Sequence, residues 1–565
     1  MKKHLLHFLL ILILEFGYYY TFAQIPYWQW AKEAGGNNSD EAYSVTTDDS
    51  GKLYVVGYFG SSSITFGSYT LTNKNAGTPD IFLAKYDAAG NVLWTASAGG
   101  TDNDYAYSVA TNRNGDIYVV GWFQSDSITF GSTTLTNANN SGFYNDDLFI
   151  TKYNAAGNVL WTQGARGIFS DEALSVTTDS SGNIYMAGWF ASDTISIGSD
   201  TLTNANIGSF TPDIFLAKYD KTGNVLWVRG GGGSGDDRTT SVTTDDSNNV
   251  YIVGFFESPS ITFGSTTLAT ANVGSFDMFI VKYDEDGNVL WAKAAGGTNA
   301  LGAYSVATDI SGNIFVLGGF QSPSITFGSN TLTNVGSRDI FLTKYDEAGN
   351  VLWAKAAGGT EYDYASSIST DLNGSVYIAG SFRSYSITFN SDTLTNKNAG
   401  TPDIFLAKYD ASGILLWALS AGETDYDETN SVTTDPNGNV YMTGYFQSDF
   451  ITFGSTTITN AGGYDMFLVK YNIQTRVENL NSSSFDEMMI FPNPTTGKVS
   501  IAGIGANINT IEIFDLFGKT IHIYNFEKGK TQIAVSVDDM PVGVYYYKVM
   551  IKGLMQKTGK VIIIH

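Results

Sequence analysis

The sequence predicts an all-β protein: a ring of seven four-stranded blades closed by an N-terminal strand, followed by a small β-sandwich. Each repeat holds four strand-like segments and shows no helical periodicity. The repeats stop near residue 473, where a second pattern of short alternating strands begins. A signature octet, DIFLAKYD or a close variant of it, occurs seven times, beginning at Asp80, Asp147, Asp213, Asp277, Asp339, Asp403 and Asp465.

The first repeat shows how each blade is assembled. Ser44 to Asp48 is a short alternating run, and a Gly-containing turn connects it to Leu53 to Phe59. Ile81 to Tyr86 is nearly all apolar, as expected of a strand buried on both faces, and Val92 to Trp94 begins the fourth strand. Between the second and third strands, the segment 63–73 predicts a small additional hairpin.

The strand count predicts how the ring closes. The serine that opens the first strand recurs at intervals of 62 to 67 residues, seven times in all, whereas the fourth-strand tryptophan that begins with Trp94 recurs only six times. The missing fourth strand precedes the first repeat, because WQWAKEAGG at Trp28 matches LWAKAAGG at Leu352. We therefore predict a seven-bladed β-propeller over residues 25–473, whose N-terminal strand completes the last blade and removes a free sheet edge.

The repeat also resembles a known family. The stretches FLAKYDAAGNVLWTASAGG, from Phe82, and DYAYSVATNRNGDIYVVGWF, from Asp104, are similar to the SBBP-type bacterial β-propeller repeat. The resemblance covers about 450 residues of the chain and implies the propeller fold. It implies little about function, because one fold serves many unrelated functions.

Composition excludes several functions. The chain carries 31 Lys and Arg against 55 Asp and Glu, a net charge of -24, and no basic cluster that would bind nucleic acid. It has no cysteine, which excludes disulfides and thiolate chemistry. The four histidines, His4, His7, His522 and His565, lie outside the repeats, which excludes Ser-His-Asp catalysis and histidine-ligated metals within the predicted propeller.

The N-terminus predicts export. Met1 to His4 is positively charged, and Leu5 to Leu14 is an apolar run too short to span a membrane. Thr21-Phe22-Ala23 places small residues before a cleavage point that precedes Gln24. Residues 1–23 are therefore a predicted signal peptide, and no transmembrane segment is expected.

The C-terminus predicts a sorting domain. After a polar linker at 474–486, residues 487–565 contain short alternating strands typical of a small Ig-like β-sandwich. The segments FPNP from Phe491, IFDLFGK from Ile513, MPVGVY from Met540 and KTGKV from Lys557 resemble the type A C-terminal sorting domain of the Bacteroidota type IX secretion system. The resemblance implies recognition by that machinery and a secreted or outer-membrane surface location. An ordinary Ig-like adhesive module is the alternative.

A recurrent acid is the candidate ligand site. Six of the seven first-strand serines follow an aspartate by four residues, and Leu301 stands at the seventh position. A ring of carboxylates at a channel mouth would suit calcium, which prefers oxygen ligands. The alternative is that each aspartate bonds to its own loop. No other cofactor is expected. The candidates are Asp40, Asp104, Asp171, Asp237, Asp363 and Asp427.

Three functions remain open. Variable loops and the additional hairpins are predicted on one face, which favours a non-enzymatic binding or adhesion module for a glycan or protein. The alternatives are a carboxylate-based polysaccharide hydrolase or lyase, which needs only two acids, and a structural surface-layer component. Trp122 and Trp189 could stack on sugars, although packing between blades is the preferred interpretation. An arginine cluster of the sialidase kind also stays open, because six arginines are not repeat features: Arg113, Arg166, Arg229, Arg238, Arg338 and Arg383.

Overall fold

Every regular element in the described part of the chain is a β-strand, and none is a helix. None of the described residues forms an apolar helix long enough to cross a membrane. The chain divides into two compact units, of which the first ends at Ile473 and the second begins at Gln474. The computed structural model describes residues 25–138, 146–165, 167–299, 301–390, 392–474, 489–491, 498–502, 510–514, 520–525, 532–537, 540–541, 543–551 and 554–563. The predicted signal peptide lies outside these residues, as does the predicted linker apart from Gln474, which is the last residue of β42.

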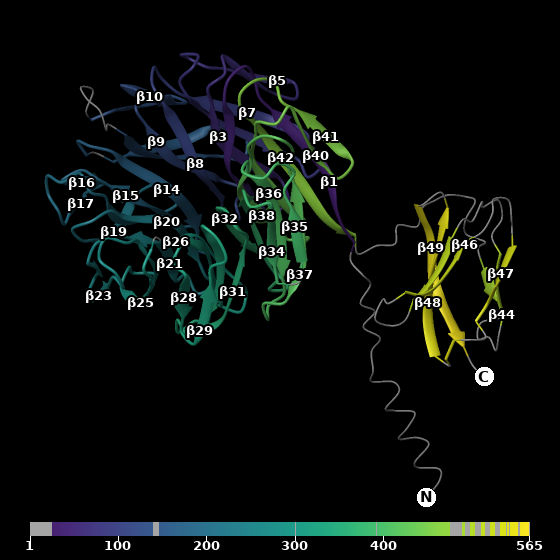
Figure 1. Ribbon diagram of the computed structural model, residues 1–565. Coiled ribbons are helices and arrows are strands. Elements are labelled where there is room, and N and C mark those ends of the chain that lie inside the picture. Colours follow the sequence, from purple (N-terminus) through teal and green to yellow (C-terminus); the bar gives the residue numbers. More distant parts are fainter. Residues whose placement is uncertain are drawn as a thin grey trace, which may run out of the picture. The chain divides into compact units, whose positions relative to one another are not determined.

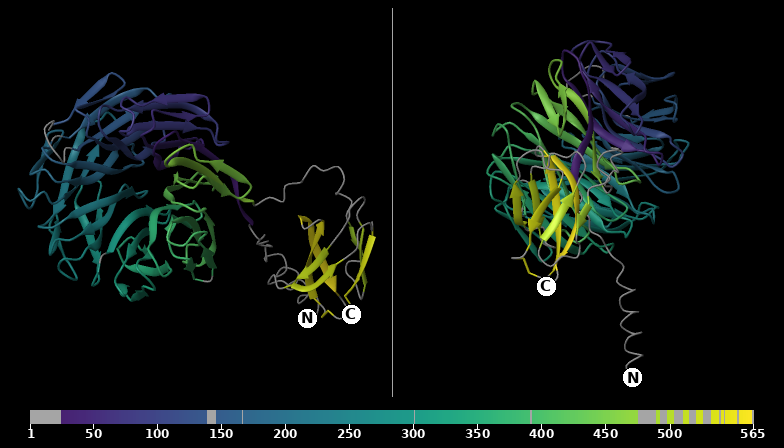
Figure 2. Two further views of the ribbon diagram at one scale, coloured as in Figure 1. Left: turned by 45° about the horizontal axis from the view of Figure 1, so that its top comes forward. Right: turned by 90° about the vertical axis from the view of Figure 1, so that its right-hand side faces the viewer.

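Residues 25–474 form seven antiparallel sheets in which the same strand order recurs, and the sheets follow one another around a common centre (Figures 1 and 2). We number the sheets 1 to 7 by the order of their first strands. The first strands are β2 (Asp40–Thr47), β8 (Asp104–Thr111), β14 (Asp171–Thr178), β20 (Asp237–Thr244), β26 (Leu301–Thr308), β32 (Asp363–Thr370) and β38 (Asp427–Thr434). The second strands are β3 (Leu53–Phe59), β9 (Ile117–Phe123), β15 (Ile184–Phe190), β21 (Val250–Phe256), β27 (Ile314–Phe320), β33 (Val376–Phe382) and β39 (Val440–Phe446).

The two remaining strands complete each sheet, and each sheet is open rather than closed on itself. The third strands are β6 (Asp80–Tyr86), β12 (Asp147–Tyr153), β18 (Asp213–Tyr219), β24 (Asp277–Tyr283), β30 (Asp339–Tyr345), β36 (Asp403–Tyr409) and β42 (Asp465–Gln474). The fourth strands are β7 (Val92–Ala98), β13 (Val159–Gly164), β19 (Val225–Gly232), β25 (Val289–Ala295), β31 (Val351–Gly358), β37 (Leu415–Ala421) and, in sheet 7, β1 (Ile25–Ala34).

The core lies between neighbouring sheets, on the second and third strands. All seven residues of β3 and all seven of β6 are buried, as their apolar runs predict. The lysine of the repeat signature is buried as well. Lys85 donates from Nζ to the carbonyl of Ala155 in sheet 2 at 2.7 Å and lies 4.9 Å from the centre of the Tyr54 ring. The lysine thus bonds two sheets together while its charge faces an aromatic ring.

Two sets of hydrogen bonds connect the first strands in sequence. The backbone N–H of Val109 donates to Ser44 Oγ at 3.2 Å, and Thr111 Oγ1 donates to the carbonyl of Thr47 at 2.9 Å. Equivalent bonds join each later pair of first strands. The same two bonds also join sheet 7 to sheet 1, through Ser431 and Thr434. The recurrent serine therefore joins neighbouring sheets by accepting a hydrogen bond from the next first strand.

The N-terminal strand β1 is the outermost strand of sheet 7, whose order is β1-β42-β39-β38 (Figure 1). Trp28 of β1 packs edge-on against Phe453 and Tyr471, with ring centres 5.1 and 5.6 Å apart. Tyr27, its neighbour in sequence, is exposed. The first and last strands of the repeat region therefore belong to one sheet, and β1 covers an edge of β42 that would otherwise be unpaired.

The predicted additional hairpin forms in each repeat. The hairpins are β4 (Ser63–Phe66) with β5 (Tyr69–Thr72), β10 (Ser127–Phe130) with β11 (Thr133–Thr136), β16 (Thr194–Ile197) with β17 (Asp200–Thr203), β22 (Ser260–Phe263) with β23 (Thr266–Ala269), β28 (Ser324–Phe327) with β29 (Asn330–Thr333), β34 (Ser386–Phe389) with β35 (Asp392–Thr395), and β40 (Phe450–Phe453) with β41 (Thr456–Thr459).

The position of the hairpins differs from the expectation that they enlarge a binding face. Ile64 and Phe66 are buried in the core cluster that contains Phe82, while Thr65 on the other side is exposed. Each hairpin contacts the fourth strand of its own sheet, and all except β16 with β17 also contact the fourth strand of a neighbouring sheet. In sheets 3 and 5 the contact becomes strand pairing, as between Gly231 and Phe263. The hairpins therefore cover the outer sheet edges, because their Ile and Phe side chains need an apolar surface.

The C-terminal unit contains two antiparallel sheets among its described residues, with orders β43-β44-β47 and β46-β45-β48-β49. The strands are β43 (Met489–Phe491), β44 (Lys498–Ala502), β45 (Thr510–Phe514), β46 (Thr520–Asn525), β47 (Gln532–Ser536), β48 (Gly543–Ile551) and β49 (Leu554–Ile563).

Candidate functional site

The six aspartates predicted as a ligand site are buried, each beside a different serine. Asp104, for example, accepts a hydrogen bond from Ser125 Oγ at 2.8 Å and one from the backbone N–H of the same serine at 3.4 Å. In every case the serine follows the second strand of the same sheet by two residues. The serine partners of Asp40, Asp104, Asp171, Asp237, Asp363 and Asp427 are Ser61, Ser125, Ser192, Ser258, Ser384 and Ser448.

Each of these aspartates also lies near the aspartate that opens a third strand in the neighbouring sheet. Burial, with a contribution from the charge of Asp80, raises the pKa of Asp104 to about 7. Burial also raises the pKa of Asp80 to about 6. The Oδ1 atom of Asp80 is buried and has no hydrogen-bond partner. We call this arrangement the carboxylate latch: a third-strand aspartate of one sheet with the first-strand aspartate and its serine of the next.

The latch explains the glycine pair that follows most fourth strands. A Cβ atom on Gly99 would lie 2.0 Å from Oδ1 of Asp80, and one on Gly100 would lie 2.4 Å from Oγ of Ser125. Only glycine fits at such distances, so the backbone closes over the carboxylates. Two of the aspartates also accept a hydrogen bond from the loop that precedes them, Asp363 from the N–H of Gly359 and Asp427 from that of Glu423. Among the described residues no three His, Cys, Asp or Glu side chains are placed to hold a metal ion.

A different set of residues departs from the repeat. In every pairing of first with second strand, the register shifts around the fourth residue of the first strand, as between Ala42 and Ser44 in sheet 1. Such bulges redirect a side chain and are common beside functional sites. The bulged position holds a different set of side chains around the array: Tyr43, Tyr107, Leu174, Thr240, Tyr304, Ser366 and Asn430.

Aromatic side chains gather around the bulges of sheets 1 and 2. Tyr43 stacks on Tyr107 of the next sheet, with ring centres 4.8 Å apart and planes 20° apart. Tyr58 meets Tyr105 at 4.8 Å, and Tyr105 meets Trp122 at 4.4 Å. Together with their counterparts elsewhere, these residues form what we call the variable cluster: Glu41, Tyr43, Tyr58, Tyr105, Tyr107, Trp122, Glu172, Trp189, Arg238, Phe255, Phe276, Tyr304, Arg338, Tyr362, Tyr364, Arg383, Tyr426, Glu428, Tyr445 and Tyr464.

Three arginines lie on aromatic rings in sheets 4, 5 and 6. The guanidinium of Arg238 lies 4.5 Å from the centre of the Trp189 ring, in sheet 3. Arg338 lies 5.1 Å from Tyr304 and 5.0 Å from Tyr364, the latter shared with Arg383. Stacked arginines of this kind present a planar cationic surface to a ligand.

Glutamates occupy the other side of the variable cluster. Glu41 accepts a hydrogen bond of 2.5 Å from Tyr58 Oη, and Glu428 accepts one of 2.8 Å from Tyr445 Oη. Burial raises the pKa of Glu41 to about 7, and the charge of Glu428 adds to the effect. Burial likewise raises the pKa of Glu172 to about 8. Sheets 7, 1 and 3 therefore supply acids, whereas sheets 4, 5 and 6 supply arginines.

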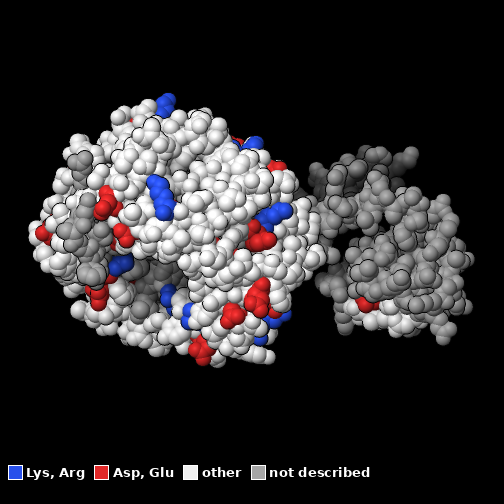
Figure 3. Space-filling model, turned by 90° about the horizontal axis from the view of Figure 1, so that it is seen from above, with Lys and Arg blue, Asp and Glu red and all other residues white. Residues whose placement is uncertain are grey.

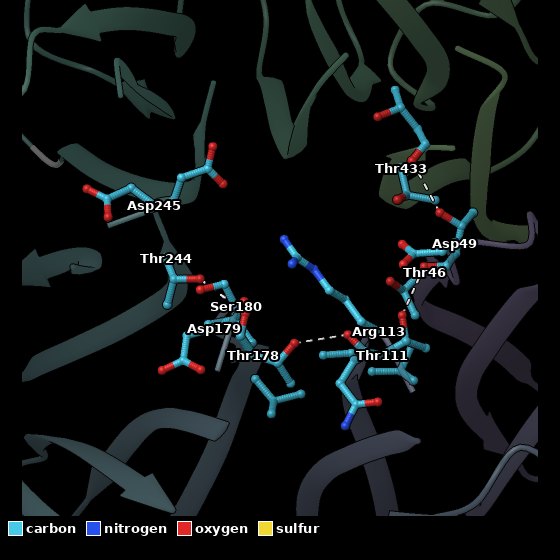
Figure 4. Close-up of a pocket in the computed structure, with 18 residues that line it drawn as sticks. Thr46, Asp49, Thr111, Arg113, Thr178, Asp179, Ser180, Thr244, Asp245 and Thr433 are labelled. Carbon is cyan, nitrogen blue, oxygen red and sulfur yellow. Dashed lines mark hydrogen bonds between the residues drawn. The ribbon is translucent and has the colours of Figure 1, made fainter. Parts of the chain in front are cut away.

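Two cavities lie along the first strands. One, of about 290 Å³, lies within the variable cluster between sheets 4 and 5. The other, of about 440 Å³, lies at the opposite ends of the first strands and is lined by threonines such as Thr111 and Thr178. Arg113 points into the second cavity (Figure 4). The surface view shows a hollow in the repeat region with both basic and acidic side chains at its edge (Figure 3).

Sequence reasoning singled out Trp122 and Trp189 as packing residues. Trp189 does contact the neighbouring sheet, through Arg238, whereas Trp122 packs at a tilt against Tyr105 of its own sheet. Both belong to the variable cluster, which the sequence analysis did not identify. The sequence does contain a signal for this cluster, because the residue type at these positions differs from repeat to repeat. The difference becomes visible when the repeats are aligned on the bulge.

Comparison with known families identifies the two parts of the chain. Residues 489–564 match the secretion system C-terminal sorting domain. Residues 417–451, from β37 to the start of β40, match the β-propeller repeat family. Both resemblances inferred from the sequence are thereby confirmed. The sorting domain indicates a secreted or cell-surface protein that is handled by the type IX machinery.

Two curated proteins are similar to much of this chain. An uncharacterized WD repeat-containing protein of Acanthamoeba polyphaga mimivirus is 25% identical over 528 residues, which cover 78% of this chain and 38% of the relative. Regulatory protein FlaEY of Caulobacter vibrioides is 24% identical over 394 residues, covering 63% of this chain and 41% of its own length. The chain thus spans about two fifths of these relatives. Among solved structures, the WD40 domain of Neurospora crassa Pan2 aligns with a TM-score of 0.36 at 7% identity, covering 80% of this chain and 99% of that domain.

Proposed function

We propose that the repeat array is a seven-bladed β-propeller closed by β1, and that the C-terminal unit is an Ig-like sandwich. The recurring strand order and the two sets of hydrogen bonds, which return from sheet 7 to sheet 1, support the blade count. The two antiparallel sheets of the C-terminal unit support the sandwich. The domains are then a cleaved signal peptide at 1–23, the propeller at 25–473, a linker at 474–486 and the sorting domain at 487–565.

We further propose that the exported propeller is a non-enzymatic binding module whose ligand, a glycan, docks on the variable cluster. The observation that carries this proposal is the concentration of non-repeating aromatic and ionic side chains around the beginnings of the first strands in an otherwise repeating array. Flat aromatic faces contact the apolar faces of sugar rings, while arginine and glutamate bond to hydroxyl groups. Repeating positions, by contrast, serve the contacts between sheets.

Tyr362 offers a test of this proposal. Its side chain is 40% exposed and lies beside Tyr364, so alanine removes a docking surface without opening the core. In a screen of the full chain against polysaccharides and oligosaccharides, we expect Tyr362→Ala to weaken glycan binding about five- to tenfold. Tyr385→Ala is the matched control, because Tyr385 is 66% exposed and lies outside the variable cluster.

Two outcomes would contradict the proposal. Equal loss of affinity in both tyrosine variants would move the site away from the variable cluster. An absence of glycan binding, together with self-association that increases with concentration, would favour a structural component of the cell surface.

A polysaccharide hydrolase is the second candidate, and the paired acids Glu41 and Glu428 favour it. One has a raised pKa and the two interact electrostatically, as in general acid and base pairs. If Glu41 is the acid, it must be protonated, so the cleavage rate should fall as the pH rises above about 7. Glu41→Gln should then lower the rate at least about a hundredfold while glycan binding persists. Binding without detectable cleavage by the native chain would remove this candidate.

A further inference from the structure

Two glycines break the repeat in sheet 5, beside the cavity between sheets 4 and 5. Gly302 pairs with Gly319 across β26 and β27. The first of these positions carries Glu41, Tyr105, Glu172, Arg238, Tyr364 and Glu428 in the other sheets. The second carries Tyr58, Trp122, Trp189, Phe255, Ser381 and Tyr445.

The space left by the two glycines is used by neighbouring side chains. A Cβ on Gly319 would lie 2.7 Å from Nε of Arg338, and one on Gly302 would lie 2.8 Å from Oη of Tyr304. Arg338 and Tyr304 therefore lie close over the backbone of sheet 5, and Arg338 donates a hydrogen bond to Tyr304. The guanidinium of Arg338 is therefore held by Tyr304 and Tyr364, which are uncharged and do not neutralise it.

The other wall comes from sheet 4. Phe255 and Phe276 meet edge to face with ring centres 5.2 Å apart, and both line the cavity. Arg238 also lines it, but Asp236 accepts two hydrogen bonds from its guanidinium, at 2.7 and 2.9 Å. Among the described residues, no carboxylate forms a salt bridge with Arg338. The cavity thus combines aromatic walls with one arginine whose charge has no acidic partner.

We propose that this cavity binds the carboxylate of an acidic sugar, a uronic acid unit within a glycan, with Arg338 as its partner. The inference rests on the proposed function and specifies its ligand class. A guanidinium matches a carboxylate with two parallel hydrogen bonds, and the aromatic walls receive the sugar ring. The volume of about 290 Å³ lies at the lower end of small-ligand sites, which suits a single ring with its substituents.

The net charge of -24 limits which acidic glycans fit. A polymer with a charge on every sugar is repelled by the protein as a whole. An alternating polymer, in which neutral sugars separate the uronic acids, places one carboxylate in the cavity and keeps the others apart. The expected ligand is therefore an alternating acidic glycan rather than a dense polyanion.

The test uses the full chain and two oligosaccharides that differ only at the carboxyl group. One alternates glucuronic acid with N-acetylglucosamine, and the other is its carboxyl-reduced form. By calorimetric titration, we expect Arg338→Gln to weaken binding of the acidic form about ten- to hundredfold and to weaken binding of the reduced form far less. Arg338→Lys should recover part of the loss, because lysine keeps the charge without the planar fork.

Two further variants complete the design. Gly319→Phe restores the aromatic residue of other repeats and should weaken binding of the acidic form, because the added ring takes the space that Arg338 occupies. Arg113→Gln removes the same charge from the opposite ends of the first strands and should bind like the native chain. Melting temperatures of all variants establish that they are folded.

The outcomes separate this inference from the proposed function. Equal affinity of the native chain for the two oligosaccharides would overturn the carboxylate assignment, as would equal losses for both in Arg338→Gln. Preference for a sulfated neutral glycan over the acidic one would also overturn it. If neutral glycans bind through Tyr362 and acidic ones do not, only this inference fails. If no glycan binds, the proposed function fails and this inference with it.

Discussion

Replacing Trp28 by alanine is expected to lower the unfolding free energy of the repeat array by about 3–5 kcal/mol. Trp28 is 9% exposed and fills the space between Phe453 and Tyr471. Removing the indole loses this contact and loosens β1, and the edge of β42 is then exposed to water. Chemical denaturation followed by tryptophan fluorescence and circular dichroism measures the effect.

Tyr27→Ala is the matched control for this prediction. Tyr27 precedes Trp28 on the same strand, but its side chain points outward and is 38% exposed. Its removal should change the unfolding free energy by less than about 0.5 kcal/mol. Similar losses in the two variants would mean that β1 contributes only through its backbone.

The array is expected to be more stable at pH 5 than at pH 8. In the folded chain, burial raises the pKa values of Asp40, Asp104 and Asp237 to about 7. The unfolded chain releases these protons near pH 4. Protonation of these carboxyl groups stabilises the fold fully at a pH below their pKa in the unfolded chain. This stabilisation is lost as the pH rises through their pKa in the folded chain. Stability should therefore fall between about pH 4 and pH 7, by up to about 1.4 kcal/mol per pH unit for each latch.

Asp104→Asn tests whether the carboxylate latch is the source of this pH dependence. Asparagine resembles the protonated acid and offers an N–H to the unpartnered Oδ1 of Asp80. We expect the variant to gain about 1 kcal/mol at pH 8 and to show a shallower decline of melting temperature with pH. Asp102→Asn, two residues away and exposed, should keep the native profile. A native profile in Asp104→Asn as well would refute the latch explanation.

Much of the fold could be predicted because the repeats reveal it. The apolar octet places the third strands, and the match between Trp28 and Leu352 places β1 in the last sheet, where the strand order has it. Periodicity and turn residues are local properties, and the strands follow them. The families of both parts were recognisable from short motifs for the same reason.

The remaining features depend on contacts between sheets. Lys85 can be buried because its Nζ donates to a carbonyl 70 residues away. The hairpins pack on a neighbouring sheet, and the sequence does not indicate which surface they contact. The predicted aspartates proved to be buried, because the glycines and serines that enclose them come from separate strands. The variable cluster was missed because a bulge, and not the linear pattern, brings its residues together.

The place of β1 in sheet 7 has a consequence for the order of assembly. Its hydrogen-bonding partner is β42, which ends at Gln474, so more than four hundred residues must be synthesised or exported before the two strands can pair. A chain made from its N-terminus keeps Trp28 without its packing partners during that time. The first strand of the repeat region is therefore placed last, and its pairing with β42 is the slow, long-range step of folding.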